Sequence, residues 1–139
     1  MIVLYGAPTC ISSKKARHWL KKHQLTFVEL NIFSSELREE TLIKILSLTN
    51  NGAEDLISKR SNCYKKLKLE ASISQMRLAN LISLLQAERK LIRQPLIFDE
   101  QNLCIGYNEE EIRVFLPKEI RRQELERNLE SIYLDKFQK

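Results

Sequence analysis

Apolar and polar positions follow two different periods in the first thirty residues. Residues 2–5 form a short apolar run with β-branched and aromatic side chains that ends at Gly6, and this predicts a buried strand. From residue 12 to residue 23 the apolar positions recur at helical spacing, with lysines largely on the other faces. Residues 26–30 again have the composition of a strand. Together these segments predict a βαβ unit with parallel strands and a right-handed crossover.

Helical periodicity dominates the middle of the chain. It predicts helices over residues 36–48, 53–58, 62–68 and about 74–88, of which the second and third are short. Asn51 and Gly52 follow the first of these helices directly. Because glycine adopts left-handed backbone conformations at little cost, the pair predicts the C-cap of that helix.

Strand character returns after Pro95. Residues 96–99 and 103–106 are apolar runs separated by a short polar segment, which predicts a β-hairpin. Asn108 with Glu111 resembles a capping box and predicts a helix from residue 109 to about 115. The order indicates an α/β fold, a thioredoxin-like core (βαβ…ββα) with an inserted helical subdomain. We expect one domain over residues 1–139, with the core at about 1–32 and 93–117, the insert at about 33–92, and a C-terminal helix or tail at about 118–139.

Composition narrows the class of protein without naming a function. The 139 residues are 43% hydrophobic and 29% charged with a net charge of +5, which excludes a disordered tail. Three cysteines are too few for a disulfide scaffold. No apolar run approaches the roughly 20 residues that cross a bilayer, and the amino terminus lacks the features of a signal peptide. We therefore expect a cytoplasmic protein with reduced thiols and no membrane partner, monomeric when free.

Basic residues are concentrated in two groups. The first lies on the first predicted helix and consists of Lys14, Lys15, Arg17, Lys21 and Lys22. The second consists of Lys59, Arg60, Lys65, Lys66 and Lys68. Phosphate contacts need positive charge and no base-reading motif, so either group is a candidate contact with DNA or with an acidic partner. Solvated helix faces have the same composition, and no known DNA-binding module is present.

The segment between the first strand and the first helix carries the candidate chemistry. Cys10 precedes the helix, where backbone N–H groups, the helix dipole and nearby lysines favour the thiolate form of a cysteine. Ser13 stands where the second sulfur of a Cys-x-x-Cys pair would be. A hydroxyl can donate a hydrogen bond to a thiolate but cannot form a disulfide. The alternative is that Cys10 is only a small, half-buried apolar residue.

The other cysteines and the histidines have simpler interpretations. Cys104 lies within an apolar strand and is expected in the core, whereas Cys63 lies between basic residues and is expected to be more exposed. His18 and His23 are expected to be solvated. The spacing of these residues matches no zinc site, so we predict no metal and no cofactor.

Three motifs resemble a known family. They are LNIFS at residues 30–34, PLIFDE at residues 95–100 and, the most specific, GYNEEEIRVFLP at residues 106–117. With the Cys10 loop, they resemble the Spx/ArsC family of thioredoxin-like proteins, and the Spx branch more than the arsenate reductases. The resemblance implies a Gram-positive bacterial regulator that binds the C-terminal domain of the RNA polymerase α subunit during thiol stress. It also implies control by ATP-dependent proteolysis.

The resemblance carries over at some positions and fails at others. Cys10 matches the first cysteine of the family's redox switch, and Ser13 replaces the second. Arg60 matches a basic position of the arsenate reductases, but their two further arginines correspond to Gln94 and Tyr107, so the oxyanion site is incomplete. The family also places a cis-proline at Pro95 and a polymerase contact at Gly52. Each position here is read from the sequence.

Two functions remain after these comparisons of residues. The first is an Spx-like transcription regulator that lacks the disulfide switch, is not an enzyme, and approaches promoter DNA within the polymerase complex. The alternative is a single-cysteine thiol oxidoreductase of the ArsC or glutaredoxin-like type that uses Cys10. Between them lies a regulator whose Cys10 senses oxidant as a sulfenic acid or a mixed disulfide.

Overall fold

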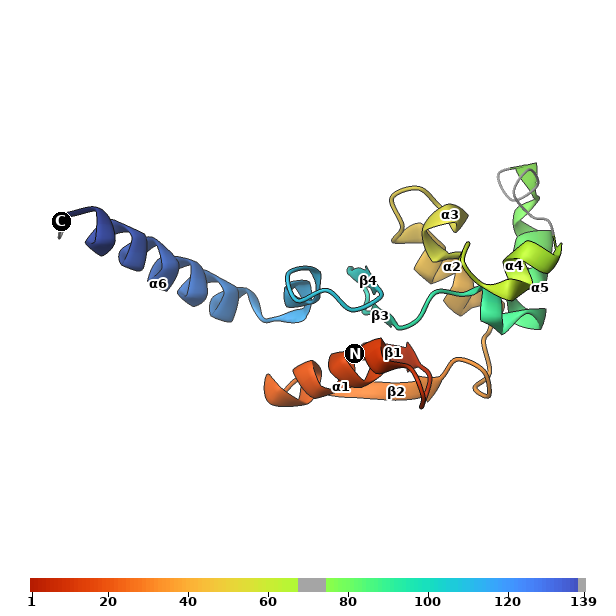
Figure 1. Ribbon diagram of the computed structural model, residues 1–139, viewed down its shortest axis with the longest axis horizontal. Helices are drawn as coiled ribbons and strands as arrows, with labels where there is room; N and C mark the ends of the chain where they lie inside the picture. The colour runs from red at the N-terminus through yellow and green to blue at the C-terminus, as the bar shows by residue number, and fades with distance from the viewer. Residues whose placement is uncertain (68–74, 138–139) are drawn as a thin grey trace.

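A four-stranded sheet forms the centre of the computed structural model, which describes residues 1–67 and 75–137. The strands are β1 (Ile2–Gly6), β2 (Phe27–Asn31), β3 (Leu96–Phe98) and β4 (Leu103–Ile105), in the order β2-β1-β3-β4. β1 pairs in parallel with β2, and β3 pairs antiparallel with both β1 and β4. The predicted parallel strand pair and hairpin are therefore confirmed (Figure 1).

Each face of the sheet packs against its own set of helices, because alternate side chains of a strand point to opposite faces. Leu4, Ile97 and Cys104 are buried with residues of α1 (Ile11–Lys22) and of the 3₁₀ helix η4 (Glu111–Phe115). Tyr5, Leu96 and Phe98 are buried in a second cluster with the inserted helices, and the Tyr5 and Phe98 rings stack 6.0 Å apart. The sheet is thus the middle layer between α1 with η4 and the insert.

The insert consists of short helices that cover the second face. They are α2 (Glu39–Ser47), α3 (Ala53–Leu56), α4 (Asn62–Leu67), α5 (Leu78–Ala87) and the 3₁₀ helix η3 (Arg89–Leu91). Leu42, Ile45, Leu56, Leu85 and Leu91 are fully buried in it. After α3 the chain leaves the helix because Ile57 forms an isolated bridge with Ile92, and Ser58 N–H donates to Leu91 O at 2.7 Å.

Several predicted bounds were wrong. The first inserted helix begins at Glu39 and not at residue 36, because side chains from α5 and η3 hold the preceding segment. Arg89 Nη1 donates to the carbonyls of Ile32 and Ser35, at 2.9 and 2.8 Å, and Gln86 Nε2 donates to Leu37 O at 2.8 Å. These carbonyls are therefore occupied by partners about fifty residues away along the chain.

Other differences are smaller. The second strand is shifted by one residue, α3 stops at Leu56, and α5 begins at Leu78, whereas residues 68 and 74 lie outside the described part. The predicted helix at 109–115 is the 3₁₀ helix η4, although Asn108 does cap it: its Oδ1 accepts from Glu110 N and Glu111 N at 2.9 and 3.1 Å.

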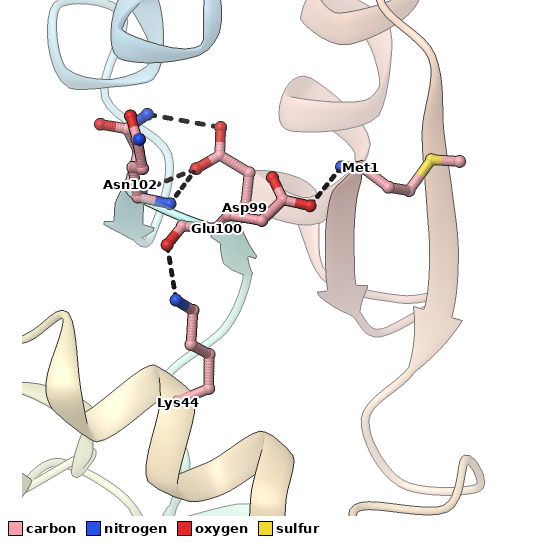
Figure 2. Close-up of polar contacts among 6 residues, drawn as sticks. Met1, Lys44, Asp99, Glu100 and Asn102 are labelled. Carbon is pink, nitrogen blue, oxygen red and sulfur yellow. Dashed lines mark hydrogen bonds and ion pairs between the residues drawn. The ribbon is translucent and has the colours of Figure 1, made fainter.

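The turn between β3 and β4 contacts both Met1, which precedes β1, and helix α2 of the insert (Figure 2). Asp99 Oδ1 accepts the backbone N–H of Asn102 at 2.7 Å and closes the turn. The Glu100 carboxylate accepts from the amino group of Met1 at 2.8 Å, and this hydrogen bond is the main cause of the lowered pKa of Glu100. Lys44 Nζ, from α2, donates to Glu100 O at 2.5 Å.

A long C-terminal helix, α6 (Lys118–Phe137), extends away from the rest of the molecule (Figure 1). An ion pair between Arg113 and Glu124 connects it to η4. Its apolar side chains are exposed, among them Leu125, Leu129 and Ile132. Within residues 1–67 and 75–137, no helix has both the length and the apolar content needed to cross a membrane.

Candidate functional site

Cys10 lies at the start of α1, as the sequence predicted. It is the N-cap residue, with extended backbone angles (φ −80°, ψ 120°), and it is partly exposed. Its N–H donates to Ala7 O at 3.2 Å, and its carbonyl accepts from Lys14 N at 3.1 Å. The thiol is therefore placed where a helix N-terminus favours an anion.

Ser13 is fully buried one turn later, and its hydroxyl faces the backbone. The Ala7 N–H donates to Ser13 Oγ at 3.2 Å. Gly6 makes room for this side chain, since a Cβ on Gly6 would lie 2.8 Å from Ser13 Oγ. No hydrogen bond in the described part of the chain joins Ser13 to Cys10 Sγ. Ser13 thus braces the loop through Ala7 and is not oriented as a partner of the thiolate.

The basic residues of α1 differ in their surroundings. Arg17 forms a bidentate ion pair with Glu29 of β2, with Nε–O distances of 2.6 and 2.8 Å. The pair also lines a small cleft of about 140 Å³ beside Pro8. Lys14 and Lys15 are exposed. Arg17 is consequently neutralised by Glu29, and the exposed charge of this group comes from its lysines.

Only Arg60 remains an arginine among the three positions carried over from the arsenate reductases. Gln94, next to the cis peptide bond at Pro95, is partly exposed, and Tyr107 is half-buried. Arg60 is exposed in the turn that leads to α4. In the described residues, no hydrogen bond or ion pair joins Arg60 or Arg93 to Cys10. Lys65 is exposed on α4, whereas the side chains of Cys63 and Lys66, and all of Lys68, lie outside the described part.

Gly52 does not cap the helix that precedes it. α2 ends at Ser47 with Leu48 as its C-cap, and Gly52 is instead the N-cap residue of α3, with φ +72° and ψ −140°. These angles, rather than packing, require glycine, because a Cβ placed there would meet no atom within 4 Å. Gly52 therefore presents open backbone at the surface.

Asp55 fixes the loop that precedes Gly52. Its Oδ2 accepts from the backbone N–H groups of Asn50 and Asn51, at 3.1 and 3.0 Å, and Oδ1 accepts from Asn51 Nδ2 at 3.3 Å. These hydrogen bonds, the Asn51 backbone N–H first among them, lower the pKa of Asp55 below its usual 3.8. The carboxylate form thus holds the loop in shape at neutral pH.

A cleft of about 480 Å³, which no motif in the sequence predicts directly, lies beside this loop. Its lining residues come from the insert, β4 and η4: Leu48, Thr49, Asn50, Asn51, Asp55, Arg93, Leu103, Ile105, Glu111 and Val114. Only the alternation of Leu103 and Ile105 on one face of β4 could have indicated an apolar surface there. The cleft requires segments that are distant in sequence, so local patterns do not predict it.

The remaining titratable candidates are structural. Cys104 is 2% exposed, which confirms the core prediction, and burial raises its pKa to about 11. His18 is exposed as expected, but His23 is half-buried, because its ring packs on Trp19 and its Nδ1 lies 2.8 Å from Trp19 O. The described residues contain no group of three His, Cys, Asp or Glu side chains that could hold a metal ion.

Known proteins resemble this chain in sequence and in fold. A family model described as the ArsC family matches residues 5–115, from β1 to η4. The chain belongs to the ArsC family. A curated relative named global transcriptional regulator Spx, from Streptococcus agalactiae serotype V, is 45% identical over 125 residues, which cover 90% of each chain. The Spx-type branch of the ArsC family, predicted from the motifs, is thereby confirmed.

Two solved structures share the ArsC fold. An ArsC family related protein from Bacteroides fragilis has a TM-score of 0.70 and 24% identity, and the match covers 79% of this chain and 92% of that one. An arsenate reductase from Vibrio cholerae has a TM-score of 0.63 and 19% identity, covering 83% and 94%. At these identities the likeness shows the fold alone, and it confirms the predicted thioredoxin-like α/β core.

Proposed function

We propose that this ArsC-family chain is a cytoplasmic, Spx-type transcription regulator that binds the C-terminal domain of the RNA polymerase α subunit. The observation that carries the proposal is the 45% identity, over 90% of the chain, to a protein named global transcriptional regulator Spx. Gly52 supports it, because it is partly exposed and a Cβ built on it would meet no atom of the described chain within 4 Å. A partner can therefore approach the backbone closely at this position.

The regulator acts without an intramolecular disulfide between residues 10 and 13. Ser13 replaces the second cysteine, and its buried hydroxyl is hydrogen bonded to Ala7 N–H. Oxidation of Cys10 can begin with a sulfenic acid or with a disulfide to a thiol other than residue 13. We expect Cys10→Ser to leave binding of the α-subunit domain within about twofold of native under reducing conditions, since Cys10 lies on another loop from Gly52.

We propose two further kinds of partner, one from the exposed basic residues and one from helix α6. Lys14, Lys15, Arg60 and Lys65 are exposed, and within residues 1–67 and 75–137 none of them forms an ion pair, which suits contact with promoter DNA once polymerase has positioned the protein. The projecting helix α6 is accessible to an ATP-dependent protease and its adaptor. Contact with DNA and recognition by a protease are thus proposed from the exposure of the four basic residues and of α6.

The test is a titration of the isolated α-subunit domain against the full chain by isothermal calorimetry. The native protein should bind at micromolar concentration or tighter, and Gly52→Asn should weaken binding at least tenfold, because it adds a side chain to the contact and strains backbone angles that only glycine adopts at low cost. Glu54→Ala, an exposed change two residues away, is the matched control and should bind like the native protein. No binding by the native chain at tens of micromolar would overturn the proposal.

A single-cysteine thiol oxidoreductase is the second candidate, and the accessible position of Cys10 at the start of α1 favours it. Cys10 would attack the glutathione sulfur of a mixed disulfide and release the other thiol, becoming glutathionylated itself. Free glutathione would then attack this new disulfide, restoring the Cys10 thiol and releasing oxidised glutathione. The test is turnover of such a substrate with glutathione, with Cys10→Ser as the inactive control. Turnover of native protein no faster than that of Cys10→Ser excludes this function.

A further inference from the structure

Asn51 is the only asparagine in the sequence that is followed by glycine. The side-chain carbonyl carbon of an asparagine, Cγ, can be attacked by the backbone nitrogen of the next residue, which closes a five-membered ring. A side chain on that next residue hinders the approach, and glycine has none. The amide of Asn51 is therefore the one in this sequence with the least hindered neighbouring nitrogen.

The structure leaves the attacking nitrogen of Gly52 available. Within the described residues the Gly52 N–H makes no hydrogen bond, because Gly52 precedes the first residue of α3 and pairs with no strand. A Cβ built on Gly52 would meet no atom within 4 Å, so the space around this peptide is open. Backbone N–H groups inside helices and strands are held by hydrogen bonds and cannot turn toward the preceding side chain. The Gly52 nitrogen has no such restraint.

The side-chain amide of Asn51 is exposed and lightly held. Its Nδ2 donates to Asp55 Oδ1 at 3.3 Å, just beyond the usual range for such a bond, whereas the Asn51 backbone N–H donates to Asp55 Oδ2 at 3.0 Å. The backbone of the loop is thus fixed more firmly than the amide. Loops with exposed hydrogen bonds open locally at little cost, so the Asn51 amide can leave Asp55 while the fold stays intact.

We propose that Asn51 is a site of spontaneous deamidation that remodels the loop before Gly52. The Gly52 nitrogen attacks Asn51 Cγ, so that a C–N bond forms and the bond from Cγ to Nδ2 breaks. Nδ2 leaves as ammonia and takes the proton of the Gly52 N–H. Water then opens the cyclic imide at either of its two carbonyl groups and leaves aspartate or isoaspartate at position 51. The sum is hydrolysis of one amide, with no oxidation or reduction.

Both products disturb the contact with Asp55. A carboxylate replaces the amide that donated to Asp55 Oδ1, so two negative charges face each other. Isoaspartate also routes the backbone through the former side chain, which adds a methylene group before Gly52. The effect on partner binding rests on the proposed function, in which Gly52 is the contact. There, deamidation gives the binding surface a limited lifetime.

The chemical test is incubation of the full chain at pH 8, followed by peptide mass spectrometry and labelling with isoaspartyl methyltransferase. Asn51 should convert within about tenfold of its rate in the same chain unfolded in urea. Asn50 is the internal control: it is exposed in the same loop but precedes a residue with a Cβ, so it should remain an amide. Asn51→Gln, which cannot close a five-membered ring, should not convert. A native rate more than about 100-fold below the rate in urea overturns the proposal, as does conversion of Asn50 as fast as Asn51.

The functional test compares fresh and converted protein in the calorimetric titration. The isoaspartyl form, separated by ion exchange, should bind the α-subunit domain at least about fivefold more weakly than fresh protein, because the loop backbone is lengthened. Asn51→Asp adds the charge without the methylene group and should weaken binding only about twofold. Native affinity of the isoaspartyl form overturns the remodelling of the partner surface.

The outcomes separate this inference from the proposed function. Tight binding by fresh protein without conversion at Asn51 overturns the inference and leaves the proposed function standing. Conversion at Asn51 without any binding by fresh protein overturns the proposed function and supports the modification site. Thermal melting of the isoaspartyl form within a few degrees of fresh protein shows that weaker binding is not loss of fold.

Discussion

The backbone N–H of Ala7 donates a hydrogen bond to the buried Oγ of Ser13 at 3.2 Å, so Ser13 holds the loop that carries Cys10. In the family resemblance, position 13 belongs to a redox switch. Here the side chain at that position has a structural role, and it connects the end of β1 to the first turn of α1. The geometry of the thiol loop therefore depends on a hydroxyl group.

Ser13→Ala should lower the free energy of unfolding by about 1–2 kcal/mol, because the Ala7 N–H would be buried without an acceptor. Urea denaturation at pH 7 measures this change. Ser12→Ala is the matched control on the neighbouring, partly exposed position, and it should change stability by less than about 0.5 kcal/mol. Equal effects of the two substitutions would show that the Ser13 hydrogen bond does not stabilise the loop.

Gly6→Ala should destabilise the protein by about 1–3 kcal/mol through overpacking. The added Cβ would lie 2.8 Å from Ser13 Oγ and 3.0 Å from Ser13 Cβ. Part of this loss should disappear in a Ser13→Ala background, since the closest atom is then absent, and a double-mutant cycle measures that coupling. Gly52→Ala is the comparison: it adds a Cβ to open space, so its cost of about 1–3 kcal/mol comes from the backbone angles alone and should not couple to Ser13→Ala. Additivity of Gly6→Ala and Ser13→Ala contradicts the contact.

The sequence predicted those elements whose patterns are local. Residues 2–5 and 96–98 alternate between two buried faces, and both faces are apolar enough to identify the strands. The position of Cys10 before α1 followed from the same periodicity, and Cys104 followed from its place in an apolar strand. For these residues, local composition and tertiary environment agree.

The failures came from contacts between distant segments. The start of α2 depends on Arg89 and Gln86, whose side chains take carbonyls that a longer helix would have used. Gly52 was assigned to the wrong helix end, because a glycine at positive φ is equally compatible with the end of one helix and the beginning of the next. The cleft with Arg93 needs the insert and β4 side by side, which no sequence pattern specifies.

Burial of Cys104 makes stability depend on alkaline pH. Burial is the largest cause that raises its pKa from 9.0 to about 11, and the charge of Glu111 acts in the same direction. Above pH 9 the unfolded chain loses this proton while the folded chain keeps it, so the free energy of unfolding falls as pH rises toward 11. At pH 11 the raised pKa of Cys104 lowers the free energy of unfolding by about 2 kcal/mol.

Chemical denaturation at intervals from pH 8 to pH 11 tests this expectation. Cys104→Ala should be less stable than native at pH 8, because a cavity forms, but its stability should fall less steeply with pH. Other groups titrate in the same range in both proteins, so the difference between the two slopes isolates Cys104. Parallel slopes would mean that the buried thiol does not resist ionisation.

Protonation of Asp55 should loosen the loop before Gly52. Hydrogen bonds from Asn51 and Asn50 lower its pKa, so the ordering of the loop is present above the usual value of 3.8 and is lost as pH falls through the lowered value. Amide NMR shifts of Asn50 and Asn51 should titrate together with a midpoint below 3.8. Asp55→Asn should abolish this titration while the rest of the spectrum stays native. A midpoint at or above 3.8 would contradict the hydrogen-bonded loop.

Ser13→Cys should create the disulfide that the native chain cannot form. The Cα atoms of residues three apart at a helix start lie about 5–6 Å from each other, within the range of Cα–Cα distances that a disulfide spans. Treatment with diamide should therefore remove two thiols per chain in Ser13→Cys, and dithiothreitol should restore them, as followed by thiol titration and mass spectrometry without reductant. Native protein has serine at position 13, so the same treatment should form no disulfide between residues 10 and 13.

The effect of oxidation on partner binding shows whether the native chain lacks a redox switch or has one that uses Cys10 without residue 13. The side chain of residue 13 is fully buried against Gly6 and Ala7, so closing a disulfide there has to pull it from the position in which Ser13 accepts the Ala7 N–H. We expect oxidised Ser13→Cys to bind the α-subunit domain with an affinity at least threefold different from its reduced form, and native protein to bind equally before and after diamide. Cys10→Ser combined with Ser13→Cys is the control that cannot close the bond. An oxidant effect on native protein as large as that on Ser13→Cys would show that Cys10 senses oxidant without its former partner.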